Sequence, residues 1–391
     1  MKKIKMMMAA ALGVLVSCGS VKSGEEAIAA SRESKVVVAY VTSWSEVMPD
    51  PQYMTHINYA FGHVNESFNG VKIDNEERLR QIVDLRKQKP ELKVLLSIGG
   101  WGSGRFSEMA ANDEYRRAFA ADCDRVVKEF ALDGIDIDWE YPTSSMANIS
   151  SSPDDTENFT LLMQDIRAAI GNEKELTLAT VASARYIDFK AILPSVDFVN
   201  IMAYDMASAP KHHSALYPSG HSGDITSDGA VTAHLKAGVP PSKLVMGMPF
   251  YGRGGDGYPS FQDYNKVGNT DTQYTEKWDE VAQVPYLADK NDTLVFGFEN
   301  PRSLAIKCQY ILDKDLLGGM YWDYSGDNEQ GDLRRTVAEN LLGKPHKAKV
   351  LVLTERGGQH GGFTDAGLRW LAAEGAKGNF SITEINNARN I

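Results

Sequence analysis

The chain has 391 residues, a formal net charge of -11 and a hydrophobic fraction of 43%. This length and apolar content allow one large domain or two ordinary ones. The acidic balance and the lack of any dense run of Lys and Arg exclude a typical nucleic-acid-binding protein.

The N-terminus reads as a targeting segment. A basic start at 1–5 precedes an apolar run at 6–16, which is too short for a typical membrane-spanning helix. The run ends in the letters LVSC, which resemble a bacterial lipobox whose cysteine, Cys18, becomes lipidated. We expect a signal peptide at 1–17 and a polar tether at 18–34. The predicted location is the cell envelope, at the outer membrane or the periplasmic face, and the alternative is an ordinary secretory signal and a secreted protein.

From residue 35 onward, short apolar runs alternate with amphipathic segments. The runs are typical of buried strands because they are continuously apolar and short. They lie at 35–41, 55–61, 92–98, 133–140, 176–181, 196–204, 244–250 and 319–322. Helices are expected at 76–89, 114–132, 154–170, 187–193, 228–237, 303–313 and 332–342. Eight strands that alternate with helices predict an α/β fold, a (β/α)8 TIM barrel over 35–343.

An open, doubly wound sheet is the alternative with the same order of elements. We favour the barrel because polar and aromatic side chains recur at the C-terminal ends of the strands, which meet at one mouth in a barrel. Ser97 and the glycines after it are expected to be architectural. The strand-end residues are Tyr40, Phe61, Ser97, Glu140, Met202, Tyr204, Asp205, Tyr251 and Trp322.

The fourth strand carries three carboxyl groups on one face. Because side chains alternate along a strand, Asp136, Asp138 and Glu140 share a face, whereas Asp133 has the other parity and reads as a strand-entry residue. Neighbouring carboxylates on a buried strand repel one another and lose hydration, so a purely structural strand would rarely carry them. The alternatives are an edge strand with a solvated acidic face and a metal-binding strip, but the apolar flanks favour a central parallel strand.

The remaining cysteines, Cys123 and Cys308, are far apart and show no metal-ligand spacing. Each falls in a predicted helix, so we expect two buried thiols and no disulfide. The sequence has no histidine cluster that suggests zinc and no Gly-rich nucleotide-binding loop after a strand. We therefore expect no metal and no cofactor.

The acidic strand and its flank, 133–142 (DGIDIDWEYP), resemble the signature of glycoside hydrolase family 18 in its chitinase-type form. Further segments match in chain order at 55–61, 97–101, 202–205, 247–253 and 319–323. The resemblance covers 35–343 and implies hydrolysis of β-1,4 bonds in polymers that contain N-acetylglucosamine. In this family the substrate's own 2-acetamido group is the nucleophile.

The resemblance also implies roles for individual residues. Glu140 would be the general acid and then the base that activates water. Asp138 would hold the acetamido N–H and share a proton with the deeper Asp136. Tyr204 would hydrogen-bond the acetamido oxygen, and Asp205 would tune the acid. The implied sugar-binding residues are Tyr40, Phe61, Gly100, Trp101, Tyr141, Met202, Tyr251, Arg253 and Trp322.

Simpler interpretations stay open for several of these side chains. Met202 and Phe61 are alternatively barrel core, and Tyr204 and Trp322 are alternatively ordinary core aromatics. Arg253 is alternatively a surface salt-bridge residue.

Two departures from the family pattern concern the depth of the groove. Residues 254–299 are short for the α+β insertion that many members carry between strands 7 and 8, although 277–286 resembles its end. Phe298 and Glu299 stand where the family often has Tyr-Asp. We expect a reduced insertion and a shallower groove.

The last part of the chain, 344–391, resembles the first βα unit of a trehalose-utilisation-type domain, with a strand at 349–353 and a helix at 364–374. One such unit cannot bury a core alone, so a truncated second domain is expected. The alternative is an extension docked on the barrel.

The leading expectation is a monomeric, lipid-anchored, retaining chitinase. The second candidate is an endo-β-N-acetylglucosaminidase that acts on N-glycan cores. The third is a non-catalytic chitin-binding lectin, which the presence of Glu140 disfavours.

Overall fold

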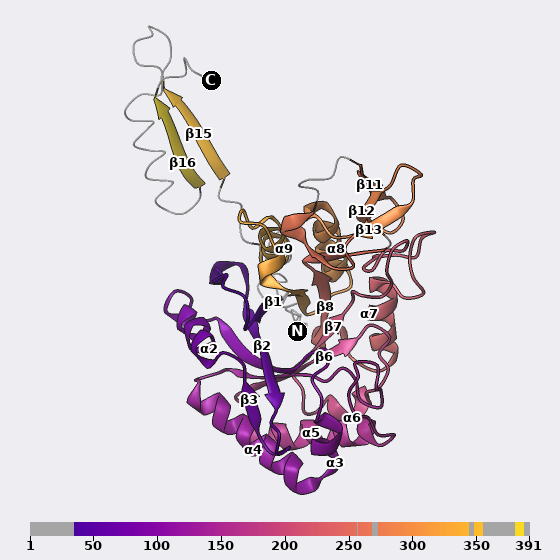
Figure 1. Cartoon of the computed structure of the whole chain (residues 1–391). Helices are drawn as coiled ribbons and strands as arrows, with labels where there is room; N and C mark the ends of the chain where they lie inside the picture. The colour runs from indigo at the N-terminus through magenta and orange to yellow at the C-terminus, as the bar shows by residue number, and fades with distance from the viewer. Residues whose placement is uncertain (1–34, 256, 268–272, 344–347, 355–379, 387–391) are drawn as a thin grey trace, which may run out of the picture.

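The computed structural model describes residues 35–255, 257–267 and 273–343, and the backbone of two further strands at 348–354 and 380–386 (Figure 1). The predicted signal peptide, the tether and Cys18 lie outside the described residues. Among the described helices, none is long and apolar enough to cross a membrane.

Eight parallel strands close into a barrel. In spatial order, β1 pairs with β14, and the ring continues through β8, β7, β6, β5, β4 and β2 back to β1. The closure confirms the predicted barrel and excludes an open sheet, which would leave two edge strands. The ring consists of β1 (Val36–Thr42), β2 (His56–Val64), β4 (Lys93–Gly99), β5 (Gly134–Asp138), β6 (Glu175–Val181), β7 (Phe198–Met202), β8 (Leu244–Pro249) and β14 (Gly318–Trp322).

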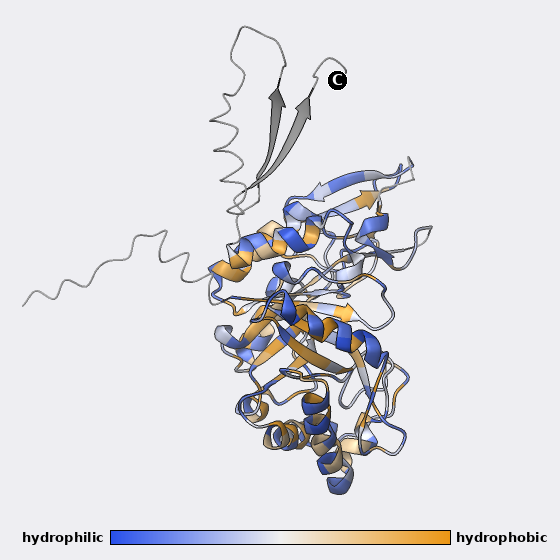
Figure 2. Ribbon diagram, turned by 90° about the vertical axis from the view of Figure 1, so that its left-hand side faces the viewer, coloured by the Kyte–Doolittle hydropathy of each residue, from blue (hydrophilic) through white to orange (hydrophobic). Residues whose placement is uncertain are grey.

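Helices cover the outside of the barrel, with their apolar faces turned towards the strands (Figures 1 and 2). They are α2 (Glu76–Val83), α3 (Phe106–Ala111), α4 (Asp113–Glu129), α5 (Asp155–Ile170), α6 (Phe189–Ile192), α7 (Ser227–Lys236), α8 (Pro301–Asp313) and α9 (Asp332–Leu342). The predicted helix at 76–89 is shorter than expected, because α2 passes into a 3-10 turn at Asp84–Lys87.

The start of α8 shows how local chemistry sets a helix boundary. The side chain of Asn300 accepts a hydrogen bond from the backbone N–H of Ser303 at 3.0 Å, and Ser303 Oγ accepts one from the N–H of Asn300 at 2.9 Å. This capping box satisfies two N–H groups that the first turn leaves open, and Pro301 fits the first helical position. The helix therefore begins two residues before the predicted start at 303.

The barrel itself has two apolar layers. The larger one lies between the strands and the helices, and it contains the buried thiols of Cys123 and Cys308, which form no disulfide. The smaller one fills the barrel interior with Val38, Tyr40, Ala60, Phe61, Phe198, Val245 and Met320. Because this inner layer lies below the strand ends, it supports the floor of the mouth described next.

The insertion after β8 is a five-stranded antiparallel sheet in the order β10-β9-β13-β12-β11. Its strands are β9 (Tyr251–Gly254), β10 (Gln262–Asp263), β11 (Thr275–Asp279), β12 (Val284–Ala288) and β13 (Leu294–Gly297). Its described part has strands and a 3-10 turn but no α-helix, which agrees with the predicted reduction. A short β3 (Val71–Ile73) also pairs antiparallel with β2, outside the ring.

In the C-terminal part, β15 (Ala348–Thr354) pairs in parallel with β16 (Phe380–Asn386) over seven residues. The strand predicted at 349–353 is present as β15. The second strand was not predicted, and the helix expected at 364–374 lies outside the described residues.

Candidate active site

Asp136 is the deepest of the three carboxyls on β5 and is fully buried. Its oxygens accept hydrogen bonds from Tyr40 Oη at 2.9 Å, Ser97 Oγ at 2.8 Å, Thr177 Oγ1 at 2.6 Å and Asn200 Nδ2 at 3.3 Å. Burial raises the pKa of Asp136, and these donors oppose the rise. Ser97 therefore points into the barrel and not to the mouth where its strand-end position had placed it.

Asp138 stands one strand repeat higher and is 4% exposed. Its Oδ1 is buried and has no hydrogen-bond partner among the described residues. Burial, followed by the charges of Glu140 and Asp136, raises the pKa of Asp138 well above its usual value. This direction is compatible with the expected sharing of a proton between Asp138 and the deeper Asp136.

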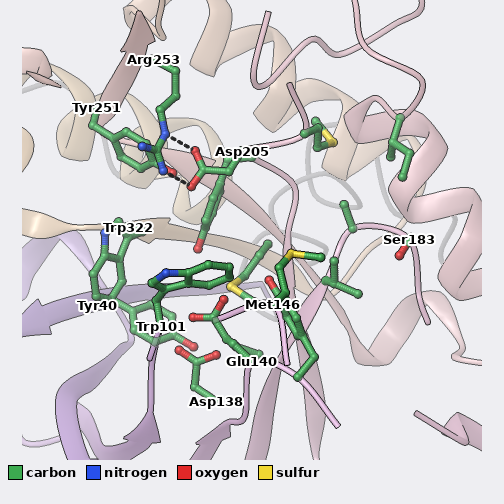
Figure 3. Close-up of a pocket in the computed structure, with 18 of the residues that line it drawn as sticks. Tyr40, Trp101, Asp138, Glu140, Met146, Ser183, Asp205, Tyr251, Arg253 and Trp322 are labelled. Atoms are coloured by element: carbon green, nitrogen blue, oxygen red, sulfur yellow. Dashed lines mark hydrogen bonds and ion pairs between the residues drawn. The ribbon is translucent and has the colours of Figure 1, made fainter. Parts of the chain in front are cut away.

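Glu140 lies two residues beyond the end of β5, at the mouth, where it points into the same cavity as Asp138 (Figure 3). Burial raises its pKa to about 7; a hydrogen bond with Tyr141 opposes this, and the charge of Asp205 adds to it. A carboxyl with this pKa can donate a proton near neutral pH and take it back afterwards. The edge-strand alternative is wrong, because β5 lies between β4 and β6.

Tyr204 follows β7 and faces Asp138 and Glu140 across the cavity. Within the described residues, its Oη makes a long contact of 3.8 Å with the sulfur of Met320. Burial raises the pKa of Tyr204 well above its usual value, so the hydroxyl keeps its proton. The hydroxyl is therefore a donor that a ligand in the cavity can use.

Asp205 is held by a guanidinium fork. Arg253 Nε and Nη2 each donate to one of its oxygens at 2.6 Å (Figure 3), and His213 Nδ1 lies 3.5 Å from Oδ1. Burial opposes ionisation, but the two hydrogen bonds from Arg253 and the nearby His213 ring prevail and lower the pKa of Asp205 below its usual range. Asp205 is therefore a fixed negative charge beside Glu140. Arg253 is a site residue and not an isolated surface ion-pair residue.

One wall of the cavity is aromatic and comes from strands at the barrel closure. The rings of Phe61 and Trp322 stack at 5.6 Å between centroids, and Tyr40 meets Trp322 at 5.7 Å. Gly100 does not line the cavity. A Cβ at Gly100 would lie 2.6 Å from the Phe61 ring, so this glycine gives the ring its space.

A second group of aromatic side chains comes from the loops after β4, β5 and β6. Trp101 is 61% exposed, and its ring contacts Tyr141 edge-on with 6.4 Å between the ring centroids. Tyr141 in turn stacks on Tyr186 at 5.6 Å and 15°. Aromatic faces suit the apolar faces of sugar rings, so the two aromatic groups form a cleft shaped for a chain of sugars.

The cavity has a volume of about 700 Å³ and gathers nearly all of the predicted site residues. Met202 lines it, as do Phe61 and Tyr251, whereas Asp136 and Gly100 lie behind its lining. Sequence reasoning missed several lining residues that stand on loops: Trp44, Met146, Ser183, Arg185, Tyr186, Met206, Ile225 and Phe261. The sequence position of Trp44 could have predicted its place in the cavity, because this aromatic residue follows the end of β1 by two residues.

The structure corrects the expectation for Glu299. It was expected to affect the depth of the groove, but it is 1% exposed and forms an ion pair with the fully buried Lys307. It does not line the cavity. The sequence position next to the insertion gave no sign that the side chain turns inward to α8. Within the described residues, no group of three or more His, Cys, Asp or Glu could hold a metal ion.

Comparison with known proteins agrees with this geometry. The model of the family "Glycosyl hydrolases family 18" matches residues 36–327. Chitinase A1 from Niallia circulans is 29% identical, over 78% of this chain and 58% of that protein. Chitotriosidase-1 from Mus musculus is 31% identical, over 75% of this chain and 74% of that protein.

Two solved structures share the fold over nearly their whole length. A glycoside hydrolase family 18 N-acetylglucosaminidase from Paenibacillus barengoltzii has a TM-score of 0.72 and 32% identity, covering 78% of this chain and 99% of that one. A group IV chitinase from Ostrinia furnacalis has a TM-score of 0.72 and 28% identity, covering 79% and 100%. The family match over most of the barrel decides the assignment, and the chain belongs to glycosyl hydrolase family 18.

Proposed function

We propose that this protein is a retaining chitinase, which hydrolyses β-1,4 bonds in N-acetylglucosamine polymers with help from the substrate's acetamido group. The observation that carries the proposal is the graded set of carboxyls on β5. Asp136 accepts four hydrogen bonds in the interior, Asp138 has one buried oxygen without a partner in the part of the chain that the structure describes, and Glu140 reaches the cavity with a pKa of about 7.

In the first step, protonated Glu140 donates its proton to the glycosidic oxygen. The acetamido carbonyl oxygen of the same sugar attacks the anomeric carbon as its bond to the leaving oxygen breaks. A cyclic oxazolinium ion forms on the sugar, and the shortened chain leaves as an alcohol. Glu140 is then a carboxylate, so charge and protons balance.

Asp138 and Tyr204 hold the acetamido group during this step. The unpartnered Oδ1 of Asp138 is an acceptor for the acetamido N–H, and a hydrogen bond there increases the electron density on the carbonyl oxygen. Tyr204 Oη donates to that oxygen and orients it for attack. Asp138 is only 4% exposed, and hydrogen bonds in a buried environment are stronger than in water.

In the second step, the Glu140 carboxylate takes a proton from a water molecule. The water oxygen attacks the anomeric carbon from the face that the leaving group vacated, and the ring of the oxazolinium ion opens to restore the acetamido group. Two inversions give net retention of the β configuration. Asp205 keeps Glu140 basic enough for this proton transfer, because its negative charge raises the pKa of the neighbouring acid.

The names of the similar proteins support a substrate that contains N-acetylglucosamine, since they are chitinases and an N-acetylglucosaminidase. The second candidate is an endo-β-N-acetylglucosaminidase acting on N-glycan cores, which would use the same chemistry. A non-catalytic lectin is disfavoured, because Glu140 and Asp138 are both in place in the cavity.

The test compares wild type and Glu140→Gln on chitin oligomers of different lengths, on a high-mannose glycoprotein and on fully deacetylated oligomers. We expect cleavage of the acetylated oligomers by wild type alone, and no cleavage of the deacetylated ones, which lack the nucleophile. Release of intact N-glycans without cleavage of chitin oligomers would favour the second candidate. A folded wild type that is inactive on all of them would refute hydrolysis.

We further propose that a lipid at Cys18 anchors a monomer to the cell envelope, through the lipobox-like end of the apolar N-terminal run. The segment 344–391 resembles the first βα unit of a trehalose-utilisation-type domain, which supports a further structural unit after the barrel. The parallel pairing of β15 with β16 is compatible with this, because parallel strands need a crossover between them.

A further inference from the structure

Asp205 stands in a backbone conformation that rarely suits a residue with a side chain. Its φ is +54°, in the left-handed region. Residues other than glycine persist there when their surroundings fix them from several sides. One such contact is made by the next residue, since the N–H of Met206 donates to the carbonyl oxygen of His213 at 3.0 Å.

The ring of His213 lies next to the carboxylate of Asp205. It is fully buried, with Nδ1 at 3.5 Å from Asp205 Oδ1, and its centroid lies 5.3 Å from the ring of Tyr251. Tyr251 is the first residue of β9, and the same strand carries Arg253, whose guanidinium group donates hydrogen bonds to Asp205. The charge beside Glu140 is thus held between β9 and the segment 212–214.

This segment is itself fixed from the interior. Ser214 Oγ donates to Glu299 Oε1 at 2.6 Å, and the carbonyl oxygen of Ser214 accepts a hydrogen bond from Lys307 Nζ. Lys307 also pairs directly with Glu299, and both side chains are 0% exposed. A fully buried ion pair loses a large hydration energy, so its presence calls for a role besides stability.

We propose that the Glu299–Lys307 pair is a remote positioning element for the acid. The pair binds both the side chain and the carbonyl of Ser214, which fixes the neighbouring His213, and His213 holds Asp205 and Met206 in place. Glu299, Lys307, Ser214 and His213 do not line the cavity, so they are positioning residues and not catalytic ones. The inference rests on the proposed hydrolase function.

The pH profile reports the placement of Asp205. The titratable groups that face Glu140 are Asp138 and Tyr141 from β5 and its end, and Tyr204 and Asp205 after β7. Those that face Asp205 are Arg253 and Tyr251 from β9, and His213. If Asp205 moves away, the proton on Glu140 is held less tightly, so the alkaline limb of kcat/KM moves to lower pH.

The test replaces the pair by apolar side chains, Glu299→Leu with Lys307→Met, because such swaps usually preserve stability whereas removal of one partner leaves a buried charge. We expect an unchanged fold, a loss of kcat/KM on a chitin oligomer of roughly 10- to 100-fold, and an alkaline limb at lower pH. Glu299→Gln with Lys307→Met keeps an acceptor for Ser214 and should recover part of the loss. Ser214→Ala removes the same link without touching either charge.

The matched control is the pair Arg116–Asp165 on α4 and α5, where Arg116 is also buried and the two groups lie 2.7 Å apart. Arg116→Met with Asp165→Asn should leave the pH limb unchanged. As a single variant, Asp205→Asn should move the alkaline limb to lower pH. In the Glu299→Leu, Lys307→Met background it should add little further shift, because the buried pair and the Asp205 substitution both act through the carboxylate of Asp205.

The outcomes separate the two proposals. An active wild type with an equally active Glu299→Leu, Lys307→Met variant and an unmoved pH limb would overturn the positioning role alone. If that variant does not fold, a Ser214→Ala protein with wild-type kcat/KM and pH limb would overturn it. A wild type without activity on any N-acetylglucosamine substrate would overturn the hydrolase function, and the positioning role with it.

Discussion

At the scale of single residues, the site depends on environment more than on residue type. Three carboxyls with the same parity on β5 differ because Asp136 has four hydrogen-bond donors, Asp138 has a buried free oxygen, and Glu140 borders the cavity. Burial raises the pKa of each carboxyl above its ordinary value, and for Glu140 it does so to about 7. Because the three are coupled by proximity, their titration belongs to the group.

Glu140→Gln removes the proposed acid while keeping its shape. We expect kcat on chitin oligomers to fall by about 100- to 10,000-fold, as is typical for loss of a general acid–base group. The melting temperature should stay close to that of wild type at acidic pH. Activity assays with a circular dichroism check would decide, and a variant with the wild-type rate would contradict the assignment.

The pH dependence of the wild type follows from the same residue. The folded pKa of Glu140 is about 7 and its ordinary value is 4.5, so the native state binds more protons between these values. Stability from this group is therefore lost as pH rises through that window, and activity falls above pH 7 as the acid deprotonates. Relative to wild type, Glu140→Gln should gain more in melting temperature at pH 8 than at pH 4. An equal difference at both pH values would count against the raised pKa.

Tyr204→Phe isolates one hydroxyl. We expect kcat to fall roughly 100-fold or more, because a donor to the reacting acetamido oxygen is lost. Stability should change little, since Oη has a long 3.8 Å contact with the sulfur of Met320. Tyr310→Phe is the control, because that hydroxyl donates to Asp228 on α7, away from the cavity. Equal kinetics for both variants would contradict the role of Tyr204.

At the scale of elements, the barrel brings strand ends together, and close backbone contacts set where the side chains stand. Gly99 shows this, since a Cβ there would lie 1.9 Å from the carbonyl oxygen of Asp138. The last residue of β4 must therefore lack a side chain for β5 to pass beside it. The same applies to Gly100 and the ring of Phe61.

Gly100→Ala tests that contact. The new methyl would lie 2.6 Å from the Phe61 ring at a φ of +91°, so we expect a destabilisation of about 1 to 3 kcal/mol and a weaker stacking wall with a higher KM. Gly171→Ala is the matched control, because its φ of +75° is also unusual but nothing lies within 4 Å of the new atom. Chemical denaturation and kinetics of both variants would separate backbone strain from displacement of the ring; equal effects would contradict the role of Gly100.

At the scale of the whole molecule, one barrel carries the site, while the chain continues at both ends. A lipid at Cys18, which the N-terminal sequence predicts, would attach the protein to a membrane. Cys18→Ser should move the protein from the membrane fraction to the soluble fraction. Fractionation of cells that produce each form would show this, and unchanged membrane association of the variant would remove the anchor.

The sequence by itself determined the order of elements and the parity of the catalytic strand, because both follow from local periodicity. Alternation along β5 placed Asp136, Asp138 and Glu140 on one face, and the apolar runs located all eight strands of the ring. Motifs at strand ends therefore predicted most of the cavity lining.

Only the tertiary structure decided which loop side chains join the site and which turn away. Tyr186 and Phe261 reach the cavity from loops, which have no periodic sequence pattern. Glu299 lies inside against Lys307, although its neighbours in sequence belong to the insertion beside the groove. Loop paths depend on packing between residues that are distant in the chain, and local sequence does not encode that packing.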